Sequence, residues 1–196
     1  MFYKIPNSYK VLKNEKIFSY SSLVLRSILQ EDIEPIRNWR NNQTTILRQK
    51  SKISKEIQQE YYENNVWNEM QSTHPKLILL SILQNSKIVG YGGFVNISWE
   101  DKRAEMSFLL SDKISKQEAL YVEIFEQFIY LAKHIAFTIV DFNRIFTETY
   151  DLRPIHISIL EKNGFKFEGR MKSHSIIDNE EVDSLIHGCL KSEYEK

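Results

Sequence analysis

The sequence has little of what a disulfide scaffold, a metal cluster or a membrane span requires. Cys189 is the one cysteine in 196 residues, which excludes an intramolecular disulfide and a multi-cysteine metal site. The five histidines show no zinc spacing, so no metal is expected. The longest apolar run, 128–142, is interrupted by charged residues and is too short for a bilayer. Residues 1–16 lack the apolar segment of a signal peptide, which predicts a cytoplasmic protein.

An excess of either charge is also missing. The chain has 26 Lys+Arg and 26 Asp+Glu, a formal net charge of zero. Nucleic-acid binders and polybasic membrane-surface proteins carry a basic excess, so we expect neither partner. Four prolines and 42% apolar residues are typical of a folded domain with a substantial core. No repeat or linker is visible, so we expect one domain over 1–196, with 1–22 as an N-terminal extension.

Residue periodicity predicts a mixed order of strands and helices. Apolar residues spaced by three and four predict a long, partly buried helix over 116–137. Ser54 is a candidate helix N-cap, and Gly164 suits a helix C-terminus. The order indicates an α+β fold with a central, mostly antiparallel twisted sheet of about six or seven strands and about four flanking helices. The expected strands are 23–28, 76–83, 87–98, 104–110, 144–150, 165–175 and 181–190, and the expected helices are 31–39, one from 54, 116–137 and 154–162.

Several short motifs lie in a fixed order along the chain. Leu160-Glu-Lys-Asn-Gly-Phe165, followed by Glu168-Gly169, reads as a short helix that leads into a strand. Together these motifs resemble the GNAT superfamily of acyl-CoA N-acyltransferases, in particular the branch of ribosomal-protein N-terminal and sugar-nucleotide acetyltransferases. The resemblance covers about 23–190 and implies a GNAT-like sheet whose strands 104–110 and 144–150 splay apart. The other motifs are Leu25-Arg26, Glu31-Asp-Ile33, Arg37-Asn-Trp-Arg-Asn41, Ile88-Val-Gly90, Ala104-Glu-Met-Ser-Phe108 and Asp183-Ser-Leu-Ile-His187.

The resemblance implies acetyl-CoA as the cosubstrate, with one departure from the family pattern. Relatives hold the CoA pyrophosphate on a glycine-rich loop at a helix N-terminus. Residues 111–128 contain no glycine here, so positively charged lysines are the candidate replacements. Arg153 stands where many relatives carry an Asn near CoA. The residues expected to bind the cofactor are Phe108, Leu109, Leu110, Lys113, Lys116 and Arg153.

Acylation of an amine by a thioester needs a base, a donor to the carbonyl and an acid for the thiolate. Glu105, among apolar neighbours in a strand expected to line the cleft, is the candidate base; alternatively it pairs with Arg103 or another cation. His156, at the start of a short helix, is a candidate proton shuttle, or else a histidine that caps or packs. Tyr150 is a candidate donor to the thiolate, or a core tyrosine with a satisfied hydroxyl.

The candidate acceptor site has two readings. Arginines of the first helix suit a diphosphate, but they also suit a solvated helix face with a pair such as Glu34 and Arg37. Gly90-Tyr-Gly-Gly93 allows close approach of substrate to the strand, or marks a β-bulge. The expected substrate-binding residues are Arg37, Arg40, Asn41, Tyr91, Gly92 and Trp99.

These residues and the resemblance predict an N-acetyltransferase that acts on a primary amine. The favoured acceptor is a small molecule, an amino sugar on a nucleotide in surface-polysaccharide synthesis. Two alternatives stay open: an acetyltransferase for protein N-termini, and a non-catalytic GNAT-fold binding module that has lost CoA. We also expect a homodimer.

Overall fold

The computed structural model describes residues 6–13 and 15–194. Its strands are β1 (Ile17–Tyr20), β2 (Leu23–Ser27), β3 (Ile78–Gln84), β4 (Lys87–Ser98), β5 (Arg103–Leu110), β6 (Arg144–Tyr150), β7 (Lys166–Ile177) and β8 (Glu180–Leu190). Its α-helices are α1 (Ile33–Asn42), α2 (Lys55–Tyr61), α3 (Trp67–Met70), α4 (Asp112–Ser115), α5 (Glu118–His134), α6 (Pro154–Lys162) and α7 (Lys191–Tyr194). Short 3-10 turns are η1 (Lys10–Leu12), η2 (Gln30–Asp32) and η3 (Thr44–Ile46), and π turns are η4 (Tyr62–Val66) and η5 (Ile135–Ile139).

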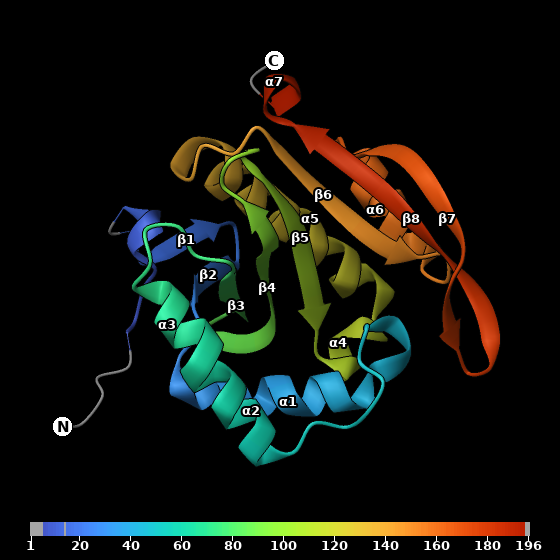
Figure 1. The fold of residues 1–196 in the computed structure, drawn as a ribbon, viewed down its shortest axis with the longest axis horizontal. Helices are drawn as coiled ribbons and strands as arrows, with labels where there is room; N and C mark the ends of the chain where they lie inside the picture. The colour runs from blue at the N-terminus through green and yellow to red at the C-terminus, as the bar shows by residue number, and fades with distance from the viewer. Residues whose placement is uncertain (1–5, 14, 195–196) are drawn as a thin grey trace.

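One sheet of eight strands organises the molecule, in the order β1-β2-β3-β4-β5-β6-β8-β7. Six of its seven pairings are antiparallel, and only β5 and β6 run parallel. Helices α5 and α6 lie behind the sheet, whereas α1 and α2 cross near the end at which β5 stops (Figure 1). The predicted α+β class and mostly antiparallel sheet are confirmed.

Local sequence signals account for several element ends. The Ser54 hydroxyl accepts a hydrogen bond from the Ile57 amide at 3.2 Å and caps α2. Gly164 follows α6 with φ of +87°, the left-handed conformation that ends helices. Asp178 and Asn179 have φ of +51° and +67° and form the tight turn between β7 and β8. These three predictions are confirmed.

The sheet has one strand more than expected, because β1 gave no sequence signal. Only Phe18 of its four residues is buried, so no apolar alternation marks the strand. β1 pairs with β2, and Tyr9 packs into the core, where its hydroxyl accepts a hydrogen bond from the Leu79 amide at 2.9 Å. The described part of the expected extension 1–22 therefore contributes to the sheet and the core, whereas residues 1–5 and 14 lie outside the described residues.

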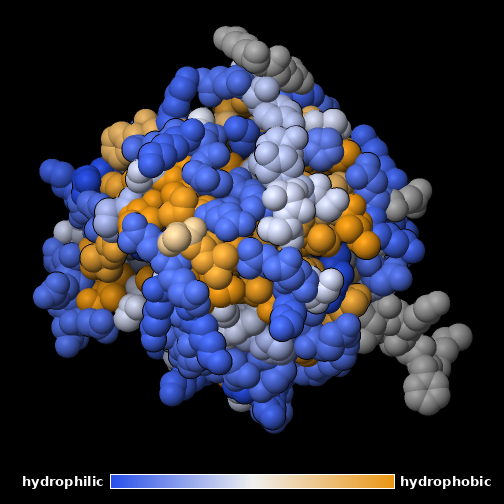
Figure 2. Space-filling view, turned by 180° about the vertical axis from the view of Figure 1, so that it is seen from behind, coloured by the Kyte–Doolittle hydropathy of each residue, from blue (hydrophilic) through white to orange (hydrophobic). Residues whose placement is uncertain are grey.

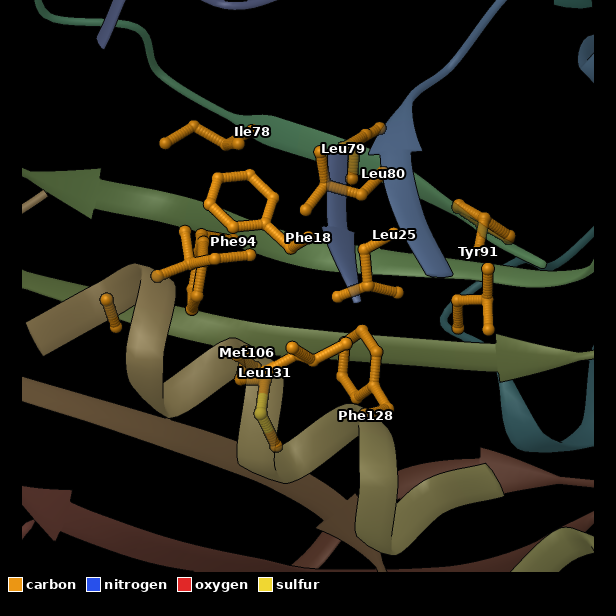
Figure 3. Packing of buried hydrophobic residues seen from close by; sticks show 14 of the residues in the cluster. Phe18, Leu25, Ile78, Leu79, Leu80, Tyr91, Phe94, Met106, Phe128 and Leu131 are labelled. Atoms are coloured by element: carbon orange, nitrogen blue, oxygen red, sulfur yellow. The ribbon is translucent and has the colours of Figure 1, made fainter. Parts of the chain in front are cut away.

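The core fills the space between the sheet and α5. Phe128 and Leu131 project from α5 towards Met106 on β5, close to Phe94 on β4 (Figure 3). Phe94 and Phe128 are fully buried. Burying an aromatic side chain of this size contributes about 2 to 3 kcal/mol. This packing fixes α5 against β5 and thereby sets one wall of the site.

The parallel pair β5–β6 is short. Its pairing joins Arg103 to Arg144, Ala104 to Ile145 and Glu105 to Phe146, and then stops. Beyond these residues the two strands diverge (Figure 1). The expected splay of these strands is therefore present, and it leaves backbone groups of both strands without a partner strand across the gap.

The molecular surface carries no large one-sided apolar face in the view of Figure 2, where apolar patches alternate with hydrophilic side chains. Within residues 6–13 and 15–194, no helix is long and apolar enough to cross a membrane.

Candidate active site

A cleft of about 430 Å³ lies where β5 and β6 part. Residues 46–62, which include the loop before α2, lie on one side of it, and α6 contributes a further wall. Both splayed strands line it, β5 with residues 105–109 and β6 with residues 147–150. The cleft is therefore built where the sheet leaves its backbone unpaired.

Two carboxylates from the two splayed strands share one guanidinium. Glu105 of β5 and Glu148 of β6 both pair with Arg48, and the Glu148 Oε2 atom lies 3.4 Å from the Arg48 Nη2 atom. The second oxygen of Glu105 accepts a hydrogen bond from the Asn96 side chain at 2.7 Å. His174 of β7 lies 3.5 Å from the second oxygen of Glu148. Glu105 is 6% exposed, so Arg48 balances a buried negative charge.

The electrostatics of Arg48 follow from this position. Burial lowers its pKa, but attraction to Glu105, the hydrogen bond to Glu105 and attraction to Glu148 outweigh burial, so the pKa of Arg48 is raised. Its side chain is 49% exposed and comes from the connection between η3 and α2. A cation from solution can therefore compete for the same two carboxylates.

Aromatic and cationic side chains line the cleft beside Glu105 and Glu148. Arg40 of α1 donates to the Tyr91 hydroxyl at 2.6 Å and to the Gln49 side chain at 3.0 Å. Burial raises the pKa of Tyr61 and Tyr62, which also line the cleft, so both phenols are neutral at physiological pH. This part of the cleft is tyrosine-rich and neutral apart from Arg40.

The opposite wall carries a buried histidine in a hydrogen-bonded chain. Arg153 donates to the Tyr121 hydroxyl at 2.8 Å, and that hydroxyl lies 2.7 Å from the Nδ1 atom of His156. The imidazole stacks on Phe125 with ring centroids 4.2 Å apart. Burial, then the charges of Arg153 and His187, hold the pKa of His156 well below its ordinary value, so its ring is neutral at pH 7.

The residues of the split fit an acyl-thioester cosubstrate. Ser107 on β5 and Thr147 on β6 line the cleft, and their hydroxyl oxygens are buried and have no hydrogen-bond partner among the described residues. Buried hydroxyls without partners are rare, and these two lie on either side of the split. Phe108 and Leu109, two of the residues expected to bind the cofactor, line the cleft beside the unpaired backbone of β5. Tyr150 lines the same cleft, and its hydroxyl makes no hydrogen bond to the described residues.

The structure brings together eight of the residues predicted for the site. The three candidate catalytic residues lie in one cleft, with the candidate Glu105 paired to Arg48 while Arg103 pairs with Asp101. The lining residues among those predicted are Glu105, His156, Tyr150, Phe108, Leu109, Arg153, Arg40 and Tyr91.

Three residues predicted to bind substrate support the loop or the hairpin instead of lining the cleft. Arg37 pairs with Glu34 at 2.7 Å, the alternative that the sequence left open. Asn41 accepts from the Ile53 amide at 2.8 Å and donates to its carbonyl at 2.9 Å, which fixes the loop before α2. Trp99 donates to the Pro75 carbonyl at 2.9 Å.

The other four predicted residues outside the lining lie in β4, at the end of β5 and beside α5. Gly92 faces the ring of Phe128 rather than the cleft. Leu110 is the last residue of β5, and its carbonyl accepts a hydrogen bond from the Gln43 side chain at 2.8 Å. Lys113 and Lys116 are exposed near the start of α5 and form no ion pair with the described residues.

Two residues of the site were missed by sequence reasoning. Glu148 lies two residues before Tyr150 on β6, so strand alternation places both on one face, and this signal could have identified it. Tyr121 gave no signal, because its contact with His156 joins residues 35 positions apart. Over the described ranges, no cluster of three or more His, Cys, Asp or Glu could hold a metal ion.

The fold and this cleft define the class of protein. The acetyltransferase (GNAT) domain family matches residues 25–186, and the chain belongs to this family. It is therefore an acyl-CoA-dependent N-acetyltransferase that uses acetyl-CoA as cosubstrate.

Solved structures share the fold at low sequence identity. The chain is similar to a spermidine N-acetyltransferase from Vibrio cholerae in complex with CoA and spermine, with a TM-score of 0.77, 17% identity, and coverage of 90% of this chain and 100% of the other. It is also similar to a dodecameric spermidine N-acetyltransferase from the same organism, with a TM-score of 0.75, 18% identity, and coverage of 89% and 97%. No curated protein sequence matches the chain.

Proposed function

We propose that this N-acetyltransferase acts on a small aliphatic diamine or polyamine, whose ammonium group binds between Glu105 and Glu148. The observation that carries the proposal is the carboxylate pair, which already binds a cation of the protein itself, Arg48. An incoming ammonium can replace that guanidinium without leaving either carboxylate buried and unpaired. The tyrosines beside the pair offer faces to further positive charges of such a chain. Similarity to enzymes named for spermidine agrees with this class of acceptor.

Glu105 is the base in this proposal. Once the acceptor has displaced Arg48, one oxygen of Glu105 is free to take a proton from the ammonium, while Asn96 holds the other oxygen. Glu148 then keeps a counter-charge beside the acceptor. The amine attacks the thioester directly, with no covalent intermediate on the protein.

The nucleotide-linked amino sugar has less support. That acceptor depended on a diphosphate site formed by Arg37 and Arg40. Arg37 is bound to Glu34 and does not line the cleft, so Arg40 is the one predicted arginine of α1 left for it. The homodimer is also a proposal, since the structure describes one chain.

The test is a thiol-release assay with acetyl-CoA against putrescine, spermidine, a nucleotide-linked amino sugar and peptides with free N-termini. We expect turnover of the polyamines.

Glu148→Gln should raise the KM for the polyamine about tenfold, because one charge-assisted contact is lost, and leave the KM for acetyl-CoA within twofold. Glu180→Gln, an exposed carboxylate at the turn between β7 and β8, is the control. Turnover of the amino sugar without the polyamines would replace the proposal, and turnover of peptides alone would favour the N-terminal acetyltransferase.

A further inference from the structure

The wall of the cleft opposite the two carboxylates contains a chain of three hydrogen-bonded side chains. A half-buried arginine, a buried phenol and a buried imidazole follow one another from Arg153 through Tyr121 to His156, over distances of 2.8 and 2.7 Å. His156 lies beside Phe108, the residue on which pantetheine is expected, with ring centroids 6.3 Å apart. Tyr150 of β6, the other candidate acid, lines the same cleft, but it belongs to no hydrogen-bonded chain among the described residues.

The direction of the hydrogen bonds in this chain is determined by its first member. A guanidinium can only donate, so the Tyr121 oxygen accepts from Arg153. The Tyr121 proton then has one acceptor among the described residues, the Nδ1 atom of His156. A neutral imidazole that accepts at Nδ1 carries its proton on Nε2. The Nε2 atom makes no hydrogen bond to the described residues, and its ring lines the cleft.

We propose that Tyr121 is a positioning residue that fixes His156 as the Nε2–H tautomer, directed into the cleft to protonate the departing thiolate. The amine nitrogen bonds to the carbonyl carbon as the carbon–sulfur bond breaks, and the electron pair of that bond stays on sulfur. The Nε2 proton moves to sulfur and the Tyr121 proton moves to Nδ1. The phenolate that results faces the Arg153 guanidinium. Glu105, which has passed the ammonium proton to solvent, takes the proton that the amine nitrogen loses and releases it to solvent in turn. The Nδ1 proton then returns to the Tyr121 oxygen, and solvent reprotonates Nε2.

The coupled transfer of two protons, from Nε2 to sulfur and from Tyr121 to Nδ1, explains how a neutral histidine can act as an acid. An imidazole that loses Nε2–H alone becomes an anion, which is unfavourable in a buried site. Transfer of the Tyr121 proton to Nδ1 keeps the ring neutral throughout. The acid is then in effect the Tyr121 phenol: burial raises its pKa above the ordinary value, while the charge of Arg153 and its hydrogen bond oppose that rise by stabilising the phenolate. Phe125, stacked on the imidazole at 4.2 Å, holds the ring plane.

The first test reads the tautomer directly by nitrogen-15 NMR of the histidine side chains at pH 7, with His156→Gln used to assign the signal. We expect the Nε2–H form in the wild-type protein and a mixture of tautomers in Tyr121→Phe. A wild-type Nδ1–H form, or a tautomer that Tyr121→Phe leaves unchanged, would overturn the proposal. This measurement needs no acceptor, so it stands even if the proposed polyamine is wrong.

The second test is kinetic and rests on the proposed acetyl transfer. Tyr121→Phe should lower kcat about 10- to 100-fold and leave the KM for acetyl-CoA within twofold, because proton transfer is lost and binding is kept. Tyr130→Phe, on the same helix with a side chain 49% exposed and stacked on Tyr20, is the matched control and should retain full activity. In a His156→Gln background, Tyr121→Phe should have no further effect. Additive losses would show that Tyr121 acts without His156 and would overturn the proposal.

Discussion

His156 makes the folded protein sensitive to acid at the scale of a single residue. Burial, then Arg153 and His187, hold its pKa well below the ordinary value of 6.5. An unfolded chain binds a proton at this imidazole below about pH 6.5, whereas the native state does not. The contribution of His156 is therefore fully present above pH 6.5 and is lost as the pH falls towards the lowered pKa.

This linkage predicts a shallower acid dependence when the histidine is removed. Between pH 6.5 and 5, the free energy of unfolding of the wild type should fall up to about 1.4 kcal/mol per pH unit more steeply than that of His156→Gln. Urea unfolding at pH 5, 6, 7 and 8 measures both slopes. His74→Gln, an exposed histidine, should keep the wild-type slope. Equal slopes for the wild type and His156→Gln would contradict a neutral buried imidazole.

The position of a candidate site residue in the cleft was predictable from the sequence where a single strand or a single helix start determines it. Glu105 among apolar neighbours and His156 after Pro154 both lie in the cleft. The ion partner of Glu105 was not predictable, because Arg48 comes from a loop 57 positions away. Nothing local distinguishes that arginine from Arg37, which forms a helix-surface pair with Glu34. Long-range contacts of this kind require the fold.

At the scale of elements, β4 depends on glycines that let neighbouring strands approach closely. A Cβ atom on Gly93 would lie 2.0 Å from the Ile78 carbonyl oxygen of β3, and Gly93 has φ of +137°. Both the contact and the backbone conformation exclude a larger residue. The Gly90–Gly93 segment therefore packs strand against strand, and the pairing of β3 with β4 shifts register at Val89, next to Gly90, in agreement with the β-bulge alternative.

Gly93→Ala should therefore destabilise the fold by about 2 to 4 kcal/mol, the cost of backbone strain and a forced displacement of β3. Denaturant unfolding at pH 7.5 measures the loss. Gly169→Ala on β7, where no atom lies within 4 Å of the added Cβ, is the matched control and should change stability by less than about 1 kcal/mol. Equal stability of the two variants would show that β3 moves away at little cost.

Pattern strength explains which elements could be predicted. The expected bounds 144–150 agree with β6, which a run of β-branched and aromatic residues marks. The expected bounds 154–162 agree with α6, which begins at Pro154 and is followed by Gly164. The long helix was expected from 116 to 137, whereas α5 begins at 118, the separate short helix α4 precedes it, and the π turn η5 continues it to 139. Hydrophobic periodicity does not separate α from π turns at this end, because Ile135, Ala136, Phe137 and Ile139 are all apolar and buried, so no single stripe marks the turn.

At the scale of the whole molecule, the sheet has two parts joined by three residue pairs between β5 and β6. The strands β1–β5 lie on one side of the split and β6, β8 and β7 on the other. The two carboxylates proposed to bind the acceptor come from the two sides, Glu105 from β5 and Glu148 from β6. A cosubstrate bound in the split contacts both parts, so its binding energy should stabilise the whole fold.

Acetyl-CoA should raise Tm, and the size of the rise tests how phosphate binds without glycines. At a hundredfold excess over Kd, binding adds about 2.7 kcal/mol, which corresponds to about 5 to 10 °C for a domain of this size. Lys113 and Lys116 lie near the N-terminus of α5, where backbone amides also attract anions. The double variant Lys113→Ala/Lys116→Ala should bind acetyl-CoA about tenfold more weakly and lose about 3 to 5 °C of the gain at the same concentration.

The comparison that isolates this site is a second double variant, Lys10→Ala/Lys172→Ala, which removes the same charge at exposed positions of η1 and β7. It should keep the full gain in Tm, because general attraction between a cationic surface and CoA phosphates would lower both variants equally. Equal losses would assign the phosphates to another part of the chain. No gain for the wild type at about 1 mM acetyl-CoA, a binding energy weaker than about 4 kcal/mol, would favour the non-catalytic binding module. Lys113 and Lys116 would then stand where relatives carry the glycine-rich loop without binding the CoA pyrophosphate, and the split between β5 and β6 would bind another ligand.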